Sequence, residues 1–373
     1  MTYYKYLKAI TLIISILIHS PLFANDGAFF ARGNQLIPIN ETEISVQKEI
    51  LRITKIDNRY IEVSVYYEFF NPAEEKEIIV GFEAMSPSGD VDGAPINGQH
   101  PYMHDFTVRM NDLPLDYKVA LISDSLYNHN GNIKTIDWEH FDGHKAGNYV
   151  DFFYVYHFNT KFKKGKNTIN HTYRFDVSGG IAYNYYFEYV LTAANRWANR
   201  QIDDFTLEID MGHFEEFYLN KSFFNNINDW KIQGKGKICE IAGSPDSPIN
   251  TDAMHCYVQY GKIVFTKKKF RPKGELFLQS FSPYMGVSEI DGVDFYLPFS
   301  IYLQEQAFYG DNTTPEAKKI LRNLPFARRG YVFQDPQLHH FYSDFGWYIP
   351  NPKYVAVVKD LTVEEQQWVE RWK

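Results

Sequence analysis

The stretch Arg59–Asn71 reads RYIEVSVYYEFFN, and it decides the fold class. Apolar side chains fall at every second position from Ile61 to Tyr67, and mostly polar ones lie between them. A period of two is typical of a strand with one buried face. The runs Glu43–Asp57 and Glu77–Met85 on either side have the same character. We therefore expect three strands that form a meander at one end of a β-sandwich.

Similar runs continue along the chain, and no long helical pattern interrupts them before residue 314. They are Val150–Phe162, Asn167–Val177, Tyr183–Leu191, Ile202–Ile209, Trp230–Cys239, Cys256–Lys268, Glu275–Phe281 and Val293–Leu303. Residues 213–229 look mixed and partly helical. Many short strands separated by turns predict one or two antiparallel β-sandwich domains over residues 25–310. If there are two, we place the boundary near the irregular residues 123–149, because long loops are uncommon inside a compact domain.

The pattern changes to that of helices at Thr314. Thr314 is suited to cap a helix that has Pro315 in its first position, and apolar residues follow at helical spacing as far as Leu324. Pro325 should end or kink this helix, because it has no backbone N–H and clashes with the preceding turn. Asp335 should cap a second helix, through about Ser343.

A third helix is expected to start near Leu361, with Val363, Trp368 and Trp372 packing back on the first two. Residues 314–373 therefore predict a small α-rich C-terminal domain, mainly helical where the preceding body is mainly β. The rings between Leu321 and Pro352 are dense enough to form a core of their own.

The N-terminus has the composition of an export signal. Lys5 and Lys8 precede the ten-residue apolar run Ala9–Ile18, and the short segment His19–Phe23 leads to the small residue Ala24. This arrangement predicts a cleaved signal peptide over residues 1–24. No later segment approaches the 18 apolar residues that a membrane-spanning helix needs. We expect an exported protein, periplasmic or extracellular, with no membrane span after signal cleavage.

Charge and cysteine content restrict the function further. The formal net charge is −8, so no basic field is available for phosphates and a nucleic-acid partner is not expected. Cys239 and Cys256 are the two cysteines of the chain. Because both follow the export signal, an oxidising compartment favours a disulfide between them. Two cysteines are too few for a zinc site of the usual kind.

The tail carries a recognisable motif around Phe326–Gly330, which reads FARRG. The other matching residues are Leu321-Arg322-Asn323, Tyr331, Phe333, Leu338, Tyr342, Trp347-Tyr348, Leu361 and Glu365. Their order and spacing resemble the YARHG domain, a small module of exported bacterial proteins, over residues 315–370. Phe326 stands where the motif has Tyr, and Arg329 stands where it has His. The resemblance implies an extracellular appendage and supplies no catalytic residue.

The body resembles, more loosely, an uncharacterised family of exported bacterial β-proteins, a domain of unknown function. The shared features are Asn25-Asp26, the strand at Ile44-Ser45-Val46 and the segment from Tyr189 through Asn195-Arg196-Trp197 to Phe205-Thr206-Leu207. This resemblance covers roughly residues 25–300 and also implies no catalytic residues.

The candidate binding residues lie in the tail. Arg328 and Arg329 could hold a planar anion, and Tyr331, Trp347 and Tyr348 could add an aromatic surface. The alternative is that an arginine pairs with Asp335, Asp344 or Glu365 and ties the domain together. His339 and His340 are expected on the surface.

One loop could hold a metal, and a second class of function stays open. The loop contains Asp137, Glu139, His140, Asp142 and His144, but its glycine and asparagine content favours a solvated loop, so no metal or other cofactor is expected. No known catalytic motif is present. We expect a non-enzymatic binding or structural role with peptidoglycan, surface polysaccharide or an envelope protein as partner. The alternative is an envelope hydrolase, a glycosidase or peptidase, with carboxylates on loops.

Overall fold

The structure is a computed structural model that describes residues 31–34, 37–39, 43–87, 91–122, 133, 135–140, 152–178, 183–245, 247, 249–281, 289–290, 293–294 and 314–373. The predicted signal peptide at residues 1–24 lies outside this set, and so does most of the predicted boundary region at 123–149. Both therefore stay predictions.

Strands form most of the regular structure in the described part of the body. They are β1 (Ala31–Asn34), β2 (Ile37–Pro38), β3 (Ser45–Ile56), β4 (Tyr60–Asn71), β5 (Lys76–Met85), β6 (Met103–Met110), β7 (Leu113–Pro114), β8 (Lys118–Ile122), β9 (Phe153–Phe162), β10 (Gly165–Asp176), β11 (Tyr183–Val190), β12 (Ile202–Asp210), β13 (Glu215–Asn220), β14 (Trp230–Ile241), β15 (Ala253–Phe270), β16 (Leu276–Phe281), β17 (Glu289–Ile290) and β18 (Val293–Asp294). Short 3-10 turns lie at Trp138–His140, Thr192–Arg196, Ile227–Asp229 and Val358–Asp360. The mainly-β prediction is confirmed.

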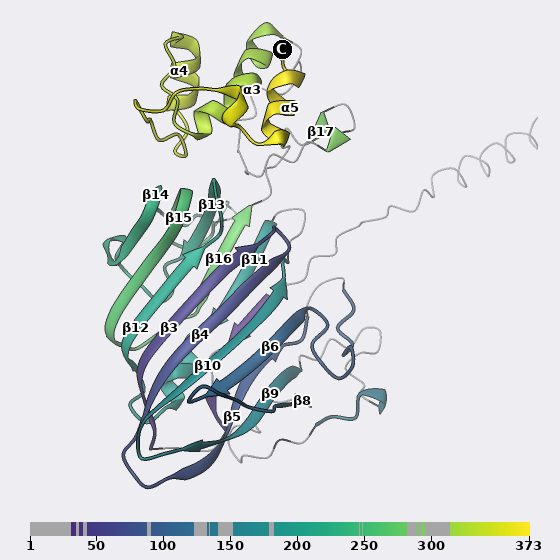
Figure 1. Ribbon diagram of the computed structural model, residues 1–373, viewed down its shortest axis with the longest axis vertical. Coiled ribbons are helices and arrows are strands. Elements are labelled where there is room, and N and C mark those ends of the chain that lie inside the picture. The colour runs from purple at the N-terminus through teal and green to yellow at the C-terminus, as the bar shows by residue number, and fades with distance from the viewer. Residues whose placement is uncertain are drawn as a thin grey trace, which may run out of the picture.

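One large sheet spans the body (Figure 1). Among the described residues it has 12 strands in the order β1-β11-β16-β13-β15-β12-β3-β4-β10-β6-β7, with β14 paired to β15. A 4-stranded sheet, β2-β5-β9-β8, packs on one face of it. The ring of Phe82 in this smaller sheet lies 4.7 Å from that of Tyr173 in β10. The aromatic richness of the sequence is thus used largely in the core between strands.

Three details differ from the sequence-based expectation. β12 pairs with β3, and β1 with β11, in parallel, whereas the prediction was antiparallel throughout. β5 pairs with β9 rather than with β4, so the expected three-stranded meander is wrong at its third strand. Residues 215–220 form a strand rather than a mixed segment. Each of these features depends on which distant strand lies beside a given segment. The alternation of apolar and polar residues within one segment does not specify that neighbour.

The pattern of strand pairing in the large sheet changes at residues 211–214, between β12 and β13. β12 and β13 both pair with β15, but β12 borders β3 on its other side whereas β13 borders β16. The connection turns at Gly212 (φ +94°) and Phe214 (φ +57°), and a left-handed conformation is costly for a residue other than glycine. The end of β3 and its Asp57-Asn58 turn are left beside this connection, where the candidate site forms.

Helices α3 (Pro315–Arg328), α4 (Pro336–Ser343) and α5 (Val363–Arg371) make up the C-terminal domain. The Thr314 hydroxyl accepts from Ala317 N at 3.2 Å, and the Asp335 carboxylate caps α4, as predicted. Trp368 and Trp372 are buried, also as predicted, but Val363 is 65% exposed, because it lies on the outer face of the first turn of α5.

Pro325 does not end α3, which continues to Arg328. A proline leaves the carbonyl four residues earlier without its helical donor. Here that carbonyl belongs to Leu321, and it accepts the indole N–H of Trp368 in α5 at 2.7 Å. The partner from another helix compensates for the missing bond, so the helix can run through the proline.

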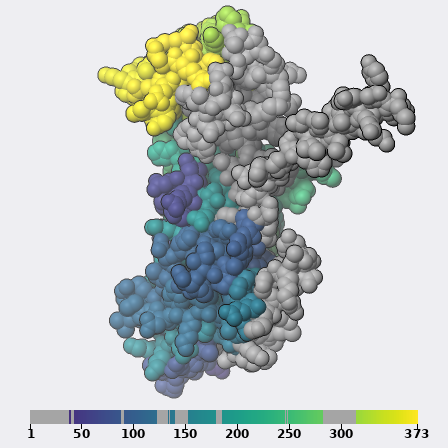
Figure 2. All heavy atoms as spheres, turned by 90° about the vertical axis from the view of Figure 1, so that its right-hand side faces the viewer, coloured from purple at the N-terminus to yellow at the C-terminus, as the bar shows by residue number. Residues whose placement is uncertain are grey.

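The C-terminal domain forms a lobe at one end of the body, shown in yellow in Figure 2. In Figure 1 its helices lie beyond the end of the large sheet that carries β13, β14 and β15. None of the helices among the described residues is both long enough and apolar enough to cross a membrane.

Candidate functional site at the junction of the sheet and the C-terminal helices

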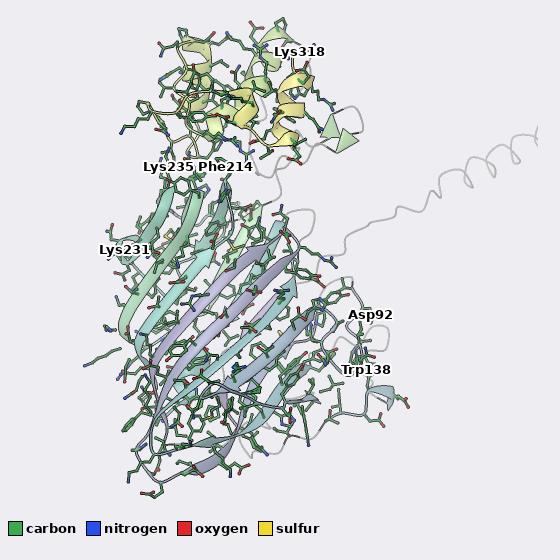
Figure 3. All side chains as sticks on the ribbon, in the orientation of Figure 1. Asp92, Trp138, Phe214, Lys231, Lys235 and Lys318 are labelled. Atoms are coloured by element: carbon green, nitrogen blue, oxygen red, sulfur yellow. The ribbon has the colours of Figure 1, made fainter. Side chains whose placement is uncertain are left out.

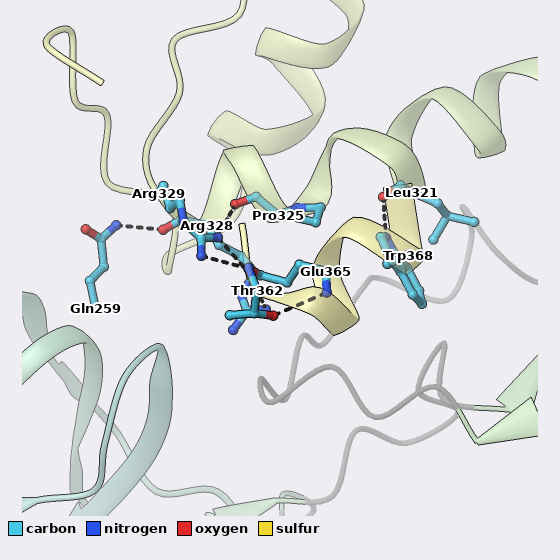
Figure 4. A network of polar contacts seen from close by, with 8 residues as sticks. All are labelled: Gln259, Leu321, Pro325, Arg328, Arg329, Thr362, Glu365 and Trp368. Atoms are coloured by element: carbon cyan, nitrogen blue, oxygen red, sulfur yellow. Dashed lines mark hydrogen bonds and ion pairs between the residues drawn. The ribbon is translucent and has the colours of Figure 1, made fainter. Parts of the chain in front are cut away.

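Arg328 and Arg329 end α3 and share one carboxylate, that of Glu365 in α5. Arg329 donates to Glu365 Oε1 and Oε2 at 2.8 and 2.7 Å, a bidentate pair, and Arg328 Nη1 lies 3.5 Å from Oε1 (Figure 4). Glu365 also accepts from the backbone N–H of Thr362 at 3.0 Å, while its own N–H donates to the Thr362 hydroxyl. This capping box places the carboxylate at the start of α5. Both arginines thus tie the domain together, as the alternative interpretation of the sequence held.

Burial affects the pKa values of Arg328 and Glu365. Arg328 is 1% exposed, and its removal from water lowers its pKa to about 9. Burial alone would raise the pKa of Glu365, but the bonds from Arg329 and the Thr362 N–H outweigh it and lower that pKa. The carboxylate is therefore held in its charged form between two guanidinium groups.

The same two arginines contact the body through Phe214, which Figure 3 shows at the end of the sheet facing the helices. The guanidinium carbons of Arg328 and Arg329 lie 4.6 and 5.1 Å from the centre of its ring. The side chain of Gln259 donates to the Arg328 carbonyl at 3.0 Å, a buried bond (Figure 4). A cation over a desolvated ring stabilises a contact by about 2 kcal/mol. The YARHG-like motif is thus a docking element here.

A second contact involves Gly346 and Tyr257. A side chain at Gly346 would place its Cβ 2.7 Å from the Tyr257 hydroxyl oxygen, so only glycine allows this approach. The Tyr257 hydroxyl lies 3.0 Å from His255 Nδ1, and His255 Nε2 lies 2.7 Å from a carboxylate oxygen of Glu216. This chain of polar contacts fixes the tyrosine against the helical domain.

On the body side, Lys55 and Glu215 form a buried ion pair at 2.5 Å, with side chains 6% and 9% exposed. The Tyr185 hydroxyl donates to the second oxygen of Glu215 at 3.0 Å, and the Lys55 amine lies 5.0 Å from the centre of the Tyr185 ring. Burial raises the pKa of Glu215, although Lys55 and Tyr185 oppose the shift. Burying this ion pair therefore carries a desolvation cost in free energy.

A cleft of about 310 Å³ lies between these two ion pairs. Its walls come from the β3–β4 turn, the β12–β13 connection and the C-terminal domain: Lys55, Asp57, Asn58, Met211, Gly212, His213, Phe214, Glu215, Arg329, Thr362 and Glu365. The volume lies at the lower end of the range of small-molecule sites. Charged groups of both signs line the cleft, and the larger part of its wall is apolar.

The aromatic residues proposed from the sequence lie inside the C-terminal domain rather than on its surface. Trp347 and Tyr348 are 4% and 7% exposed, and Tyr331 is half-buried. The Tyr348 hydroxyl donates to the Tyr331 carbonyl at 2.7 Å. Of the five residues proposed, Arg329 alone lines the cleft. His339 and His340 are exposed, as expected.

The sequence analysis missed the residues that the body contributes, namely Lys55, Asp57, Phe214 and Glu215. The Asp57-Asn58 turn could be read from the sequence, but nothing local shows that it lies beside residues 211–215. The predicted loop cluster is tested only in part, because Asp142 and His144 lie outside the described residues. Within the described ranges, no three His, Cys, Asp or Glu side chains are grouped to hold a metal ion.

The predicted disulfide is wrong, since Cys239 and Cys256 are both free thiols. The register of β14 on β15 pairs Cys239 with His255 and Cys256 with Ile238. Side chains alternate faces along a strand, so the two cysteines point to opposite faces of the sheet. Cys256 belongs to the core and Cys239 to the opposite face.

We expect alkylation of the unfolded protein without reductant to modify two thiols. In the folded protein Cys239 should react first, because burial raises the pKa of Cys256 well above its usual value and removes it from solvent. Mass spectrometry of iodoacetamide-treated protein measures both. If the mass increase from alkylation appears only after the protein has been reduced, the observed register is contradicted.

Comparison with known proteins supports the interpretation of the tail. Residues 294–373 match the model of the YARHG domain. Among solved structures, a Legionella pneumophila "putative nutrient binding protein" is 19% identical with a TM-score of 0.49, and the match covers 94% of this chain and 100% of that chain. An M1 zinc metallopeptidase from Deinococcus radiodurans is 8% identical with a TM-score of 0.23, over 60% of this chain and 43% of that chain.

Likeness at these identities and scores carries no argument about function. No curated protein matches the chain. YARHG domains are found in exported proteins. The C-terminal part of this chain is therefore a YARHG domain, and it follows a β-rich body.

Proposed function

We propose that the protein is an exported, non-enzymatic binding protein of the bacterial cell envelope, in which the β-body and the YARHG domain act as one unit. Its partner is a component of the envelope: peptidoglycan, a surface polysaccharide or an envelope protein. The observation that carries the proposal is the cleft, because its walls come from both parts of the chain. The occurrence of YARHG domains in exported proteins supports the location.

The arrangement of charges supports a joint site. Lys55 and Glu215 pair within the body, Arg329 and Glu365 pair within the tail, and both pairs line the same cleft. Phe214 contributes to the cleft wall and also supports the two arginines. Losing the docked position of the tail would therefore remove one wall of the site.

We expect Phe214→Ala to raise the undocked population of the C-terminal domain and to reduce retention of envelope material. Loss of about 1.4 kcal/mol at the contact corresponds to a tenfold larger undocked population, and trypsin should then cleave after Arg328 and Arg329 about tenfold faster. Immobilised protein (residues 25–373) is incubated with envelope extract, and retained material is compared between the variant and the unchanged chain. Peptide mapping follows the cleavage.

Phe70→Ala is the matched control, because Phe70 is an exposed ring elsewhere on the sheet, 38% accessible. It should behave like the unchanged protein in both assays. Equal retention by the unchanged protein and by Phe214→Ala, with trypsin cleavage accelerated, would show that a docked tail is not needed for binding.

A further inference from the structure

From the chemistry of the cleft, we infer that its ligand carries a protonated primary amine. The inference deepens the proposed function and rests on it, because it names the ligand class of the same site. The amine could belong to a peptide terminus or to an amino sugar, and the two sources share the chemistry that the cleft would recognise.

The three carboxylates that line the cleft differ in their partners. Two cations, Lys55 and Arg329, line the cleft together with the carboxylates of Asp57, Glu215 and Glu365. The buried Arg328 also lies 3.5 Å from Glu365. Lys55 is bound to Glu215 and Arg329 to Glu365 at 2.5 and 2.7 Å. Asp57 remains as the carboxylate of the lining with no ion-pair or hydrogen-bond partner in the described part of the chain. Asp57 is therefore the carboxylate of the lining that is open to a cationic ligand group.

The position of Asp57 is fixed by its turn. Asp57 and Asn58 have φ values of 50° and 52°, and the Arg59 N–H donates to the Ile56 carbonyl at 2.9 Å, which closes a β-turn with these two residues at its centre. Such a turn is rigid compared with a long loop, so the carboxylate is presented in one place. A preorganised carboxylate loses little freedom when it binds a cation.

The remaining groups of the lining suit the polar part of such a ligand. The Asn58 amide and the Thr362 hydroxyl offer both donors and acceptors, and the Lys55 amine has donors beyond the one that Glu215 uses. A volume of about 310 Å³ accommodates a molecule the size of a dipeptide or a single sugar ring. An amine would bind at Asp57, and the polar part of the ligand would bind the Asn58, Thr362 and Lys55 side chains.

Calorimetric titration with matched pairs of probes tests the inference. The probes are glycylglycine and its N-acetyl form, and glucosamine and N-acetylglucosamine. We expect at least one free amine to bind, and its acetylated partner to bind at least about tenfold more weakly, because acetylation removes the charge and the strong hydrogen-bond donors. The peptide and sugar pairs distinguish the two sources of the amine.

Asp57→Asn should weaken binding of the selected amine by about tenfold and leave the thermal unfolding midpoint unchanged, because asparagine tolerates the same left-handed turn. Asp112→Asn is the matched control. Asp112 also lies in an Asn-Asp turn with positive φ, at 67°, but it is not part of the cleft. The control should bind as the unchanged protein does.

Equal binding of free and acetylated probes, binding of neither, or an unchanged affinity in Asp57→Asn would each overturn the inference. The outcome is separable from that for the proposed function. If immobilised protein still retains envelope material in a Phe214-dependent manner while no amine binds, the ligand class is wrong and the binding role stands.

Discussion

Replacing Glu365 by alanine is expected to destabilise the YARHG domain by about 3 to 5 kcal/mol, enough to unfold it separately from the body. The substitution leaves Arg328 without the carboxylate 3.5 Å away, in a site where it is 1% exposed. It also removes the bidentate partner of Arg329 and half of the capping box of α5. An uncompensated buried charge is among the most destabilising changes known in a protein.

Denaturant titration followed by tryptophan fluorescence measures the effect, because Trp347, Trp368 and Trp372 lie in this domain. The variant should show an early transition that the unchanged protein lacks. Glu364→Ala is the control: Glu364 is the exposed neighbour in the same turn, so the cost should stay below about 1 kcal/mol. A single transition with an unchanged midpoint in the Glu365 variant would refute the role assigned to this carboxylate.

The Glu365 pair also has a pH signature. Folding lowers the pKa of Glu365, so the ion pair makes its full contribution to the stability of the domain above the ordinary carboxyl pKa. This stabilisation is lost as the pH falls through the lowered folded value. The early transition should therefore appear in the unchanged protein under acid conditions, and Glu365→Ala should lack this dependence.

Lys55→Ala is expected to cost about 3 to 5 kcal/mol in the body, because it leaves the Glu215 carboxylate buried without its ion-pair partner and with the Tyr185 hydroxyl as its hydrogen-bond donor. The double variant Lys55→Met with Glu215→Leu should recover most of the loss, since an apolar pair of similar volume needs no desolvated charges. Unfolding free energies from urea titration give both values. A double variant less stable than Lys55→Ala would contradict this reasoning.

The pH dependence of Lys55→Ala has the opposite sign to that of the Glu365 pair. The pKa of Glu215 is raised in the fold already, and loss of Lys55 removes an interaction that opposes the shift. A carboxyl with a raised pKa holds its proton more tightly in the native state, so stability decreases as the pH rises from its unfolded to its folded pKa. The free energy of unfolding of Lys55→Ala should be closest to that of the unchanged protein at low pH. Lys268→Ala serves as control, because Lys268 forms an exposed pair with Asp204.

Local patterns in the sequence predicted the elements well. The alternation from Ile61 to Tyr67 matches β4, and Thr314 and Asp335 cap the helices that they were expected to cap. These features depend on neighbours a few residues away, so short-range sterics and hydrogen bonds decide them. Pro325 shows the limit of such reasoning, because its effect on α3 is offset by Trp368 from another helix.

Pairing between distant strands was not predictable in the same way. The parallel neighbours β12 and β3 are separated by about 150 residues, and the one-residue offset between Cys239 and Cys256 in the ladder is a matter of register. Two cysteines in an exported chain favour a disulfide by composition, but a strand's alternation puts these two on opposite faces. Register is set by packing of the whole sheet, which a single segment does not contain.

The sequence by itself determined that the chain has a mainly-β body, a short helical C-terminal domain and a motif of the YARHG type, because local period, helix caps and residue order are carried by each segment alone. Only the tertiary structure decided which groups the two arginines of the motif contact. From the sequence, Arg328 and Arg329 could bind an external anion or pair with an internal carboxylate, and pairing within the domain was the favoured interpretation. Their proximity to Glu365 and Phe214 settles their contacts, since Coulomb and cation–π interactions depend on distance in space rather than along the chain.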